Sequence, residues 1–199
     1  MTKPSESGTT EVASILPKVS IEGYFKITST DTRSGTETVE YEGSNAVHPR
    51  NFSLLIAKAI AGIPDQAIGE LVLGNGGSVI AADSSITYNP LRVSDSNASL
   101  YNQTYQVALT GASAVSVYQG SVGTSSVVMC NATIPASIPY DQLPSEDVPE
   151  ASFSNDYAFD EIGLKTIDGK LLTHKVFSPI LKTAQKEIKF VYAITITVS

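Results

Sequence analysis

The clearest pattern in this chain is the alternation of apolar and polar positions at its C-terminal end. Between residues 187 and 198 one face carries Ile188, Phe190, Tyr192, Ile194, Ile196 and Val198. The opposite face carries Glu187, Lys189, Val191, Ala193, Thr195 and Thr197. A period of two in β-branched and aromatic residues is typical of a strand with one buried face. The pattern therefore predicts a terminal strand that contributes much of the core, and whose other face meets water or a neighbouring subunit.

Shorter runs of the same kind, separated by Gly, Ser and Asn, predict further strands before this one. They cover residues 18–28, 36–41, 68–73, 86–93, 104–109, 115–119, 126–134, 157–165 and 171–177. Gly23 inside the first run predicts a bulge or a close backbone approach. Asp168-Gly169 predicts a tight hairpin turn, because this pair tolerates the positive φ such a turn needs. A break in the strand pattern is expected near Ser178-Pro179.

One segment shows helical spacing instead. Its apolar positions, at i, i+3, i+4, i+7 and i+8, are Phe52, Leu55, Ile56, Ala59 and Ile60. This stripe predicts an amphipathic helix over residues 51–61. Asn51 is the expected N-cap, Gly62 the expected residue after the C-cap, and Pro64 prevents continuation. A helix this short is not stable alone in water, so we expect its apolar face to pack on a sheet.

These elements predict an all-β protein, namely an antiparallel β-sandwich of about nine strands with one short α-helix. We expect a single domain over residues 18–199. Residues 1–17 are rich in Ser, Thr, Glu and Lys, and are predicted to form an extended, flexible N-terminal arm. Residues 135–156, with several prolines and acids, are predicted to form a long loop.

Composition narrows the function classes. The net charge of the 199 residues is −7, and Arg92 is the only basic residue between Gln66 and Phe159. A nucleic-acid binder would carry a concentrated basic face, so recognition of a nucleic-acid sequence is not expected. No apolar run approaches the roughly 18 residues of a membrane span, and the first residues lack the apolar core of a secretory signal.

Cys130 is the only cysteine, so it cannot form an intrachain disulfide, and we interpret it as a small buried hydrophobe.

The glycines and histidines are the residues that could form a phosphate-binding, catalytic or metal-binding site. The run Gly74–Gly77 lacks the Lys and the following helix of a phosphate-binding loop, so we interpret it as a turn. His48 and His174 are far apart in the sequence, and His174 lies in a predicted strand, which favours a packing or interface role. Two His and one Cys without ligand spacing argue against a zinc site.

Seven acidic residues lie along the predicted loop and the strand after it: Asp141, Glu146, Asp147, Glu150, Asp156, Asp160 and Glu161. We interpret them as a solvated, partner-facing group. Binding of Ca²⁺, or a glycosidase carboxylate pair, remains an alternative, although Trp is absent. No catalytic, cofactor-binding or metal-binding residue is assigned, and the chain is not expected to be an enzyme.

The order of five segments resembles structural proteins of tailed bacteriophages, in particular tail-collar, neck and baseplate components. The segments are LLIAKAIAG (54–62), ELVLGNGG (70–77), DEIGLKTIDGKLL (160–172), SPILK (178–182) and the strand from Glu187. In those proteins a short helix precedes a strand with a Gly-rich turn, and a Glu-hydrophobic-Gly-Leu strand and an Asp-Gly turn follow. The resemblance covers about half the chain. The N-terminal arm and first hairpin are additional, and no fibre repeat follows.

The resemblance implies a virion structural protein, assembled in the cytoplasm of the host bacterium, that acts by subunit–subunit contact. A ring-forming neck, collar, tail or baseplate part is expected, with copies of itself and other virion proteins as partners and with no catalytic residues or membrane contact. Two alternatives remain. The β-rich composition also suits a capsid decoration protein, and nine Tyr with polar loops suit a carbohydrate-binding module of a host-contacting appendage.

Overall fold

The computed structural model describes residues 19–64, 66–95, 97–109, 116–121, 128–139, 152–153 and 156–198. Residues 116–121, 128–136, 152–153 and 156–157 are described by their backbone alone. The helix is α1 (Pro49–Ile60), and the strands are β1 (Val19–Asp31), β2 (Glu37–Val47), β3 (Ile68–Gly74), β4 (Ser78–Ile80), β5 (Ile86–Tyr88), β6 (Gln103–Ala108), β7 (Ser116–Ser121), β8 (Val128–Ile138), β9 (Ser152–Phe153), β10 (Asp156–Thr166), β11 (Leu171–Lys182) and β12 (Lys186–Val198).

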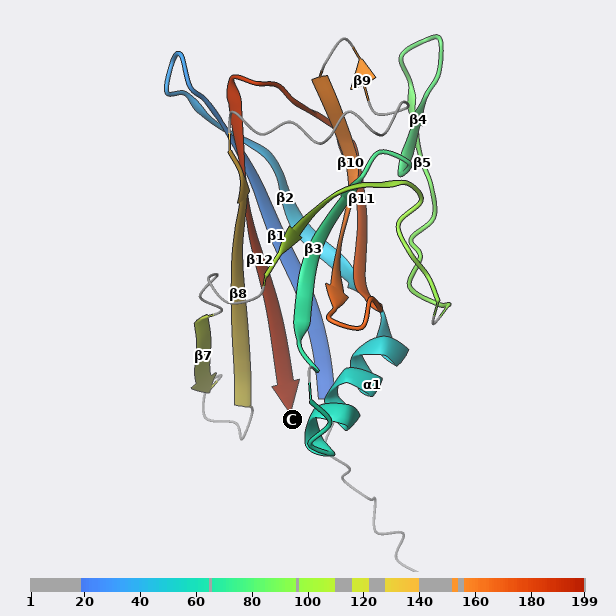
Figure 1. The fold of residues 1–199 in the computed structure, drawn as a ribbon, viewed down its shortest axis with the longest axis vertical. Helices are drawn as coiled ribbons and strands as arrows, with labels where there is room; N and C mark the ends of the chain where they lie inside the picture. The colour runs from blue at the N-terminus through green and yellow to red at the C-terminus, as the bar shows by residue number, and fades with distance from the viewer. Residues whose placement is uncertain are drawn as a thin grey trace, which may run out of the picture.

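The strands form one large antiparallel sheet and one small one (Figure 1). In the large sheet the order is β6-β3-β10-β11-β2-β1-β12-β8-β7, and β9 pairs with β10 beside this path. The sheet curves around the core into a nearly closed, barrel-like shape, and β6 approaches β8 across the remaining opening. The small sheet is the hairpin β4–β5, which lies outside this wall.

The expected all-β, antiparallel class with one short helix is confirmed for the described residues. The two layers expected of a sandwich belong to one hydrogen-bonded sheet in the structure. They are joined where β2 pairs with β11, through only the residue pairs Val47–Thr173 and Ala46–His174. Because the sheet is nearly closed, both layers share the main core, and a smaller cluster of Val72, Leu100 and Leu171 lies apart from it.

Several predicted strand details need correction. The run 86–93 forms a strand only as far as Tyr88, and Pro135–Ile138, assigned to a loop, belongs to β8. The expected break at Ser178-Pro179 is a bulge inside β11, where the pairing with β10 jumps from Glu161–Val176 to Phe159–Ile180. A bulge tolerates Pro because the extra residues there make no ladder hydrogen bonds. The remaining predicted loop, 140–151, lies outside the described residues, as does the predicted arm.

Gly23 causes no bulge in β1, because the register shift with β2 falls between Ile27 and Thr28. Gly23 instead marks a close approach between strands, the other outcome expected of it. A Cβ added there would lie 3.4 Å from the Cβ of Asn45, the residue opposite.

The terminal strand β12 lies between β1 and β8, so it is an internal strand of the sheet. Its contribution to the core is confirmed for Ile188, Phe190, Tyr192 and Ile194, which are at most 3% exposed. Val198 is 38% exposed, because the strand runs beyond the core at its end. Tyr192 stacks on Phe25 of β1, with ring centroids 5.8 Å apart, and so ties β12 to the centre of the barrel.

The helix α1 ends as expected, with Gly62 at φ +69° after the C-cap Ala61. Its N-cap is His48, whereas Asn51 lies inside the first turn. The apolar face is buried only near the start of the helix: Phe52 is 3% exposed, but Ile60 is 82% exposed. The prediction was wrong for Ala59 and Ile60, because α1 contacts β11 at the lower end of the barrel and its last turn extends away from that contact (Figure 1).

Candidate functional site

Two acidic residues at the centre of β10, Asp160 and Glu161, are buried. Asp160 is 4% exposed and Glu161 is 0% exposed. The interpretation of these two as solvated, partner-facing acids was therefore wrong. The side chains of the other five acids of that group lie outside the described residues.

Glu161 binds two chain segments that are distant in sequence. Its Oε1 accepts hydrogen bonds from the backbone N of Asn102 at 2.8 Å and from that of Gly76 at 3.3 Å. Its Oε2 accepts from the backbone N of Tyr101 at 2.9 Å. The carboxylate therefore connects the turn after β3 to the segment before β6.

His174 of β11 completes this cluster. Its Nε2 lies 3.1 Å from Oε2 of Glu161, and its Nδ1 accepts a hydrogen bond from the backbone N of Arg92 at 2.8 Å. A ring nitrogen that accepts carries no proton, so His174 is neutral and donates from Nε2 to Glu161. Burial alone would raise the pKa of Glu161, but the hydrogen bonds from His174 and the two amides outweigh it and lower that pKa.

Asp160 holds the end of the glycine turn. Its Oδ1 accepts from the backbone N of Gly77 at 2.8 Å, and its Oδ2 accepts from the backbone N and the hydroxyl of Ser78 at 2.8 and 2.6 Å. Burial nevertheless outweighs these bonds and raises the pKa of Asp160. The interpretation of residues 74–77 as a turn is confirmed, and the amides that a phosphate would need are occupied by the protein's own carboxylates.

His48 binds the chain segment that contains Arg92, the residue held by His174. It is fully buried, and its Nε2 donates to the backbone O of Asp95 at 2.7 Å. Its Nδ1 accepts from the backbone N of Asn51 at 3.3 Å, which caps α1. Both histidines therefore hold residues 92–95, and the packing role expected of His174 is confirmed.

The buried cluster is thus a structural anchor for two loops. Each carboxylate oxygen and each ring nitrogen named above has a partner in the protein itself. Among the described residues, no group of three or more His, Cys, Asp or Glu has an arrangement that could hold a metal ion. In that same part of the chain, no helix is long and apolar enough to cross a membrane.

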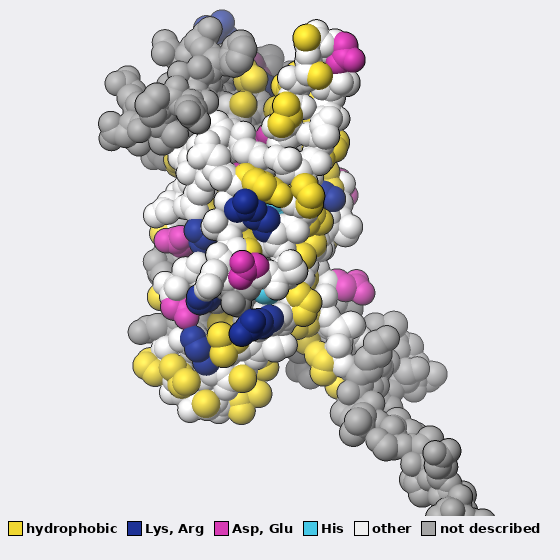
Figure 2. Space-filling view, turned by 90° about the vertical axis from the view of Figure 1, so that its right-hand side faces the viewer, with side chains coloured by type: hydrophobic (Ala, Val, Ile, Leu, Met, Phe, Trp, Pro, Cys, Tyr) yellow, Lys and Arg dark blue, Asp and Glu magenta, His cyan; other side chains and the backbone are white. Residues whose placement is uncertain are grey.

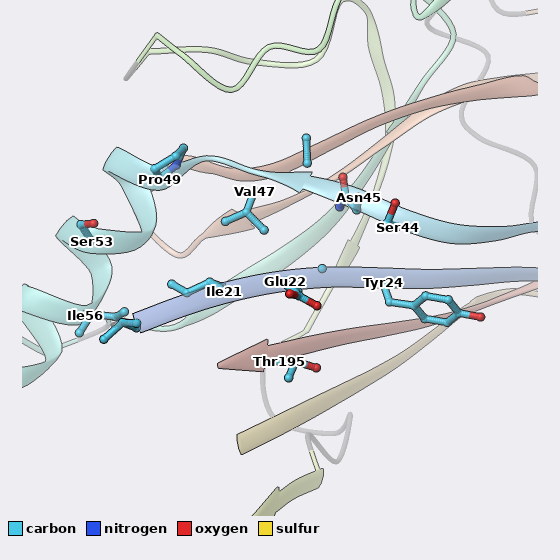
Figure 3. A pocket seen from close by; sticks show the side chains of 13 residues that line it. Ile21, Glu22, Tyr24, Ser44, Asn45, Val47, Pro49, Ser53, Ile56 and Thr195 are labelled. Atoms are coloured by element: carbon cyan, nitrogen blue, oxygen red, sulfur yellow. The ribbon is translucent and has the colours of Figure 1, made fainter. Parts of the chain in front are cut away.

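A groove of about 800 Å³ lies between β1, β2 and the start of α1. Figure 3 shows the two strands diverging toward the helix, with Val47 pointing from β2 into the space between them. Ile21 lines the groove from β1, and Ser53 and Ile56 line it from α1. The lining combines apolar side chains such as Ile21, Val47 and Ile56 with polar ones such as Glu22, Tyr24 and Ser44.

Asn45 is one of the polar residues that line this groove. Its Oδ1 and Nδ2 are both buried, and neither has a hydrogen-bond partner among the described residues. A buried amide without partners costs about 1–3 kcal/mol. Because both atoms are buried even while the groove is empty, a ligand seated in the groove would not reach them.

A second candidate surface is the hairpin β4–β5, on which large apolar side chains are exposed. Val79, Ile80 and Tyr88 are 59%, 60% and 50% exposed. Figure 2 faces the side of the molecule that carries this hairpin and α1, and shows apolar side chains gathered at its lower end and in its projecting upper-right part. Clustered exposure of this kind is typical of protein contact surfaces.

No family model, no curated protein and no solved structure matches this chain.

Proposed function

We propose that this chain is a structural subunit of a tailed-bacteriophage virion. It assembles in the cytoplasm of the host bacterium as a ring-forming part of the neck, collar, tail or baseplate. Its activity is contact with copies of itself and with other virion proteins, and it performs no chemical step.

The observation that carries this proposal is the way the resembling segments pack together. The segment 54–62 belongs to α1, 70–77 covers the end of β3 and its turn, and 160–172 covers most of β10 and the hairpin into β11. β3 pairs with β10, β10 pairs with β11, and α1 contacts β11. Motifs that resemble the phage proteins in order thus form one packed unit, which is what a shared architecture requires.

The exposed apolar surface adds support. The hairpin β4–β5 and the end of α1 lie toward opposite ends of the long axis of the molecule (Figure 1). Ile80 on the hairpin and Ile60 on the helix are 60% and 82% exposed. Two different apolar surfaces on one subunit suit head-to-tail contacts, which close into rings when the rotation between subunits permits it.

The mass of the purified chain in solution tests the assembly directly. We expect a concentration-dependent oligomer by native mass spectrometry, and we expect Ile80→Lys to shift the population toward monomer, because the interface would have to bury the introduced charge. Val39→Lys is the matched control, because Val39 is also exposed, at 49%, but lies on β2, away from both proposed surfaces. A wild-type chain that remains monomeric at every concentration would contradict self-assembly.

A further inference from the structure

The barrel wall is open between β1 and β2 beside the helix. Pairing between these strands extends from Thr30–Glu37 only to Gly23–Asn45, although β1 begins four residues earlier, at Val19. Over residues 19–22, β1 pairs with β12 on one side. On the other side it pairs with no described strand, because β2 has turned away to pair with β11.

The groove described above lies in this opening. It is lined by Ile21 and also by Glu22, which point to opposite faces of β1 because side chains alternate along a strand. The groove therefore passes through the wall, at the position where the next strand of the sheet would lie. An unpaired strand edge with a groove beside it is the arrangement that accepts an added strand from another chain.

We propose that this opening receives the N-terminal segment of a second copy of the chain, bound as an extended strand beside residues 19–22. The backbone of the incoming segment pairs with the free edge of β1, and its apolar side chains meet Ile21, Val47 and Ile56. This inference deepens the proposed function, on which it rests for the presence of neighbouring copies.

The occupant is suggested by the residues that precede β1. Residues 1–18 lie before Val19, and Val19 itself lines the groove. Their last part, Val12-Ala13-Ser14-Ile15-Leu16, has the apolar side chains that the groove walls would cover. At about 3.3 Å per residue, Leu16 and Val12 reach roughly 10 and 23 Å from Val19, so the inference places the neighbour's groove directly beside the start of β1.

Pro17 argues against the tightest return of the segment onto its own chain. For Leu16 to return beside Val19 of its own chain, Pro17-Lys18 would have to form a two-residue hairpin turn. Turns of this length need a positive φ at their first central residue, whereas Pro is fixed near −65°. Pro17 thus excludes this tightest return, and the dilution experiment below distinguishes a longer loop within one chain from exchange between copies.

Disulfide trapping between two different single-cysteine chains tests the inference. Both chains carry Cys130→Ser, one also carries Ile15→Cys, and the other carries Glu22→Cys in the groove. Glu37→Cys replaces Glu22→Cys in the control, because both glutamates are exposed and Glu37 lies at the far end of the β1–β2 pairing. A bound segment raises the local thiol concentration from about 1 μM to about 1 mM, so the groove pair should cross-link on the order of 1,000-fold faster than the control pair.

Equal rates for the groove and control pairs would overturn the inference, and so would the absence of a cross-link at Glu22→Cys. A second experiment places Ile15→Cys and Glu22→Cys in one chain and adds an excess of cysteine-free chain. It distinguishes a strand supplied by another copy from a strand supplied by the same chain. Loss of the disulfide on dilution supports exchange between copies, whereas its persistence within one chain contradicts it. An oligomer that forms without any groove cross-link would remove this inference and leave the proposed function intact.

Discussion

Nε2 of His174 donates a hydrogen bond to Oε2 of Glu161 over 3.1 Å, and both side chains are 0% exposed. The two residues stand on the neighbouring strands β11 and β10, so the bond lies within the sheet. Through their remaining atoms they hold the backbone of Gly76, Tyr101, Asn102 and Arg92. One buried pair therefore fixes the path of two loops that carry no regular structure of their own.

Removing this carboxylate should strongly destabilise the fold. Glu161→Ala leaves three backbone amides and the His174 ring without their acceptor, and we expect a loss of about 3–5 kcal/mol in the free energy of unfolding. Urea denaturation measures it. Glu42→Ala is the control, since Glu42 is half exposed and its ion pair with Lys26 spans 3.8 Å, so its removal should cost at most about 1 kcal/mol. Equal losses for the two variants would contradict the anchoring role.

Acid should weaken the same anchor. The pKa of Glu161 is lowered, because its hydrogen bonds favour the carboxylate more than burial disfavours it. Such a group contributes stability that is complete above its unfolded pKa, near about 4.3, and is lost as the pH falls through its folded pKa. The raised pKa of Asp160 acts with the opposite sign, since its contribution is present at low pH and is lost as the pH rises through that pKa.

Comparison of the wild type with Glu161→Gln isolates the first effect. The difference in free energy of unfolding should be largest near neutral pH and should shrink below about pH 4, because the glutamine does not titrate. Denaturation curves across this range provide the measurement. A difference that stays constant from about pH 7 to about pH 3 would mean that the pKa of Glu161 is not lowered on folding.

The helix should respond unevenly along its length. Phe52→Ala removes a buried ring and should cost about 3–5 kcal/mol in unfolding free energy. Ile60→Ala should change it by less than about 0.5 kcal/mol, because Ile60 is 82% exposed. Thermal melts of both variants show the contrast. A large loss at Ile60 in the monomer would mean that the last turn packs on the barrel.

The two ends of the chain should differ in importance for the fold. Deleting residues 188–199 removes four buried side chains, worth roughly 6–12 kcal/mol together, and leaves β1 and β8 without their shared neighbour. This truncation should unfold the protein. Deleting residues 2–16 should leave the circular dichroism spectrum unchanged but prevent incorporation into particles. Normal incorporation without residues 2–16 would show that they have no part in assembly.

The sequence carried enough local signal to predict most of the strands and the turn at Gly74–Gly77, but not β4 or the β4–β5 hairpin. Period-two alternation places β12 in the core, and Gly62 marks the helix end, because both effects act within a few residues. Glu161 and His174 could not be paired in this way, since their contact depends on the register between β10 and β11. The groove could not be predicted from the sequence either, because it forms where β2 stops pairing with β1 and pairs with β11 instead.

The local sequence does contain a pattern that indicates the burial of Asp160 and Glu161. Both lie within an apolar strand pattern, between Phe159 and Ile162, and not within the acidic loop before it. A charged pair inside such a strand is buried only if it finds several donors, and the glycines of 74–77 supply some of these through their backbone amides.

The central claim, that this chain is a structural part of the virion, is tested most directly by counting it in purified particles. Quantitative mass spectrometry of gradient-purified virions should find the chain at a fixed ratio to the known neck and tail proteins, and should find it lost from tail-less capsids. Equal amounts on tail-less capsids would instead identify a capsid decoration protein. Absence of the chain from purified particles would contradict the account.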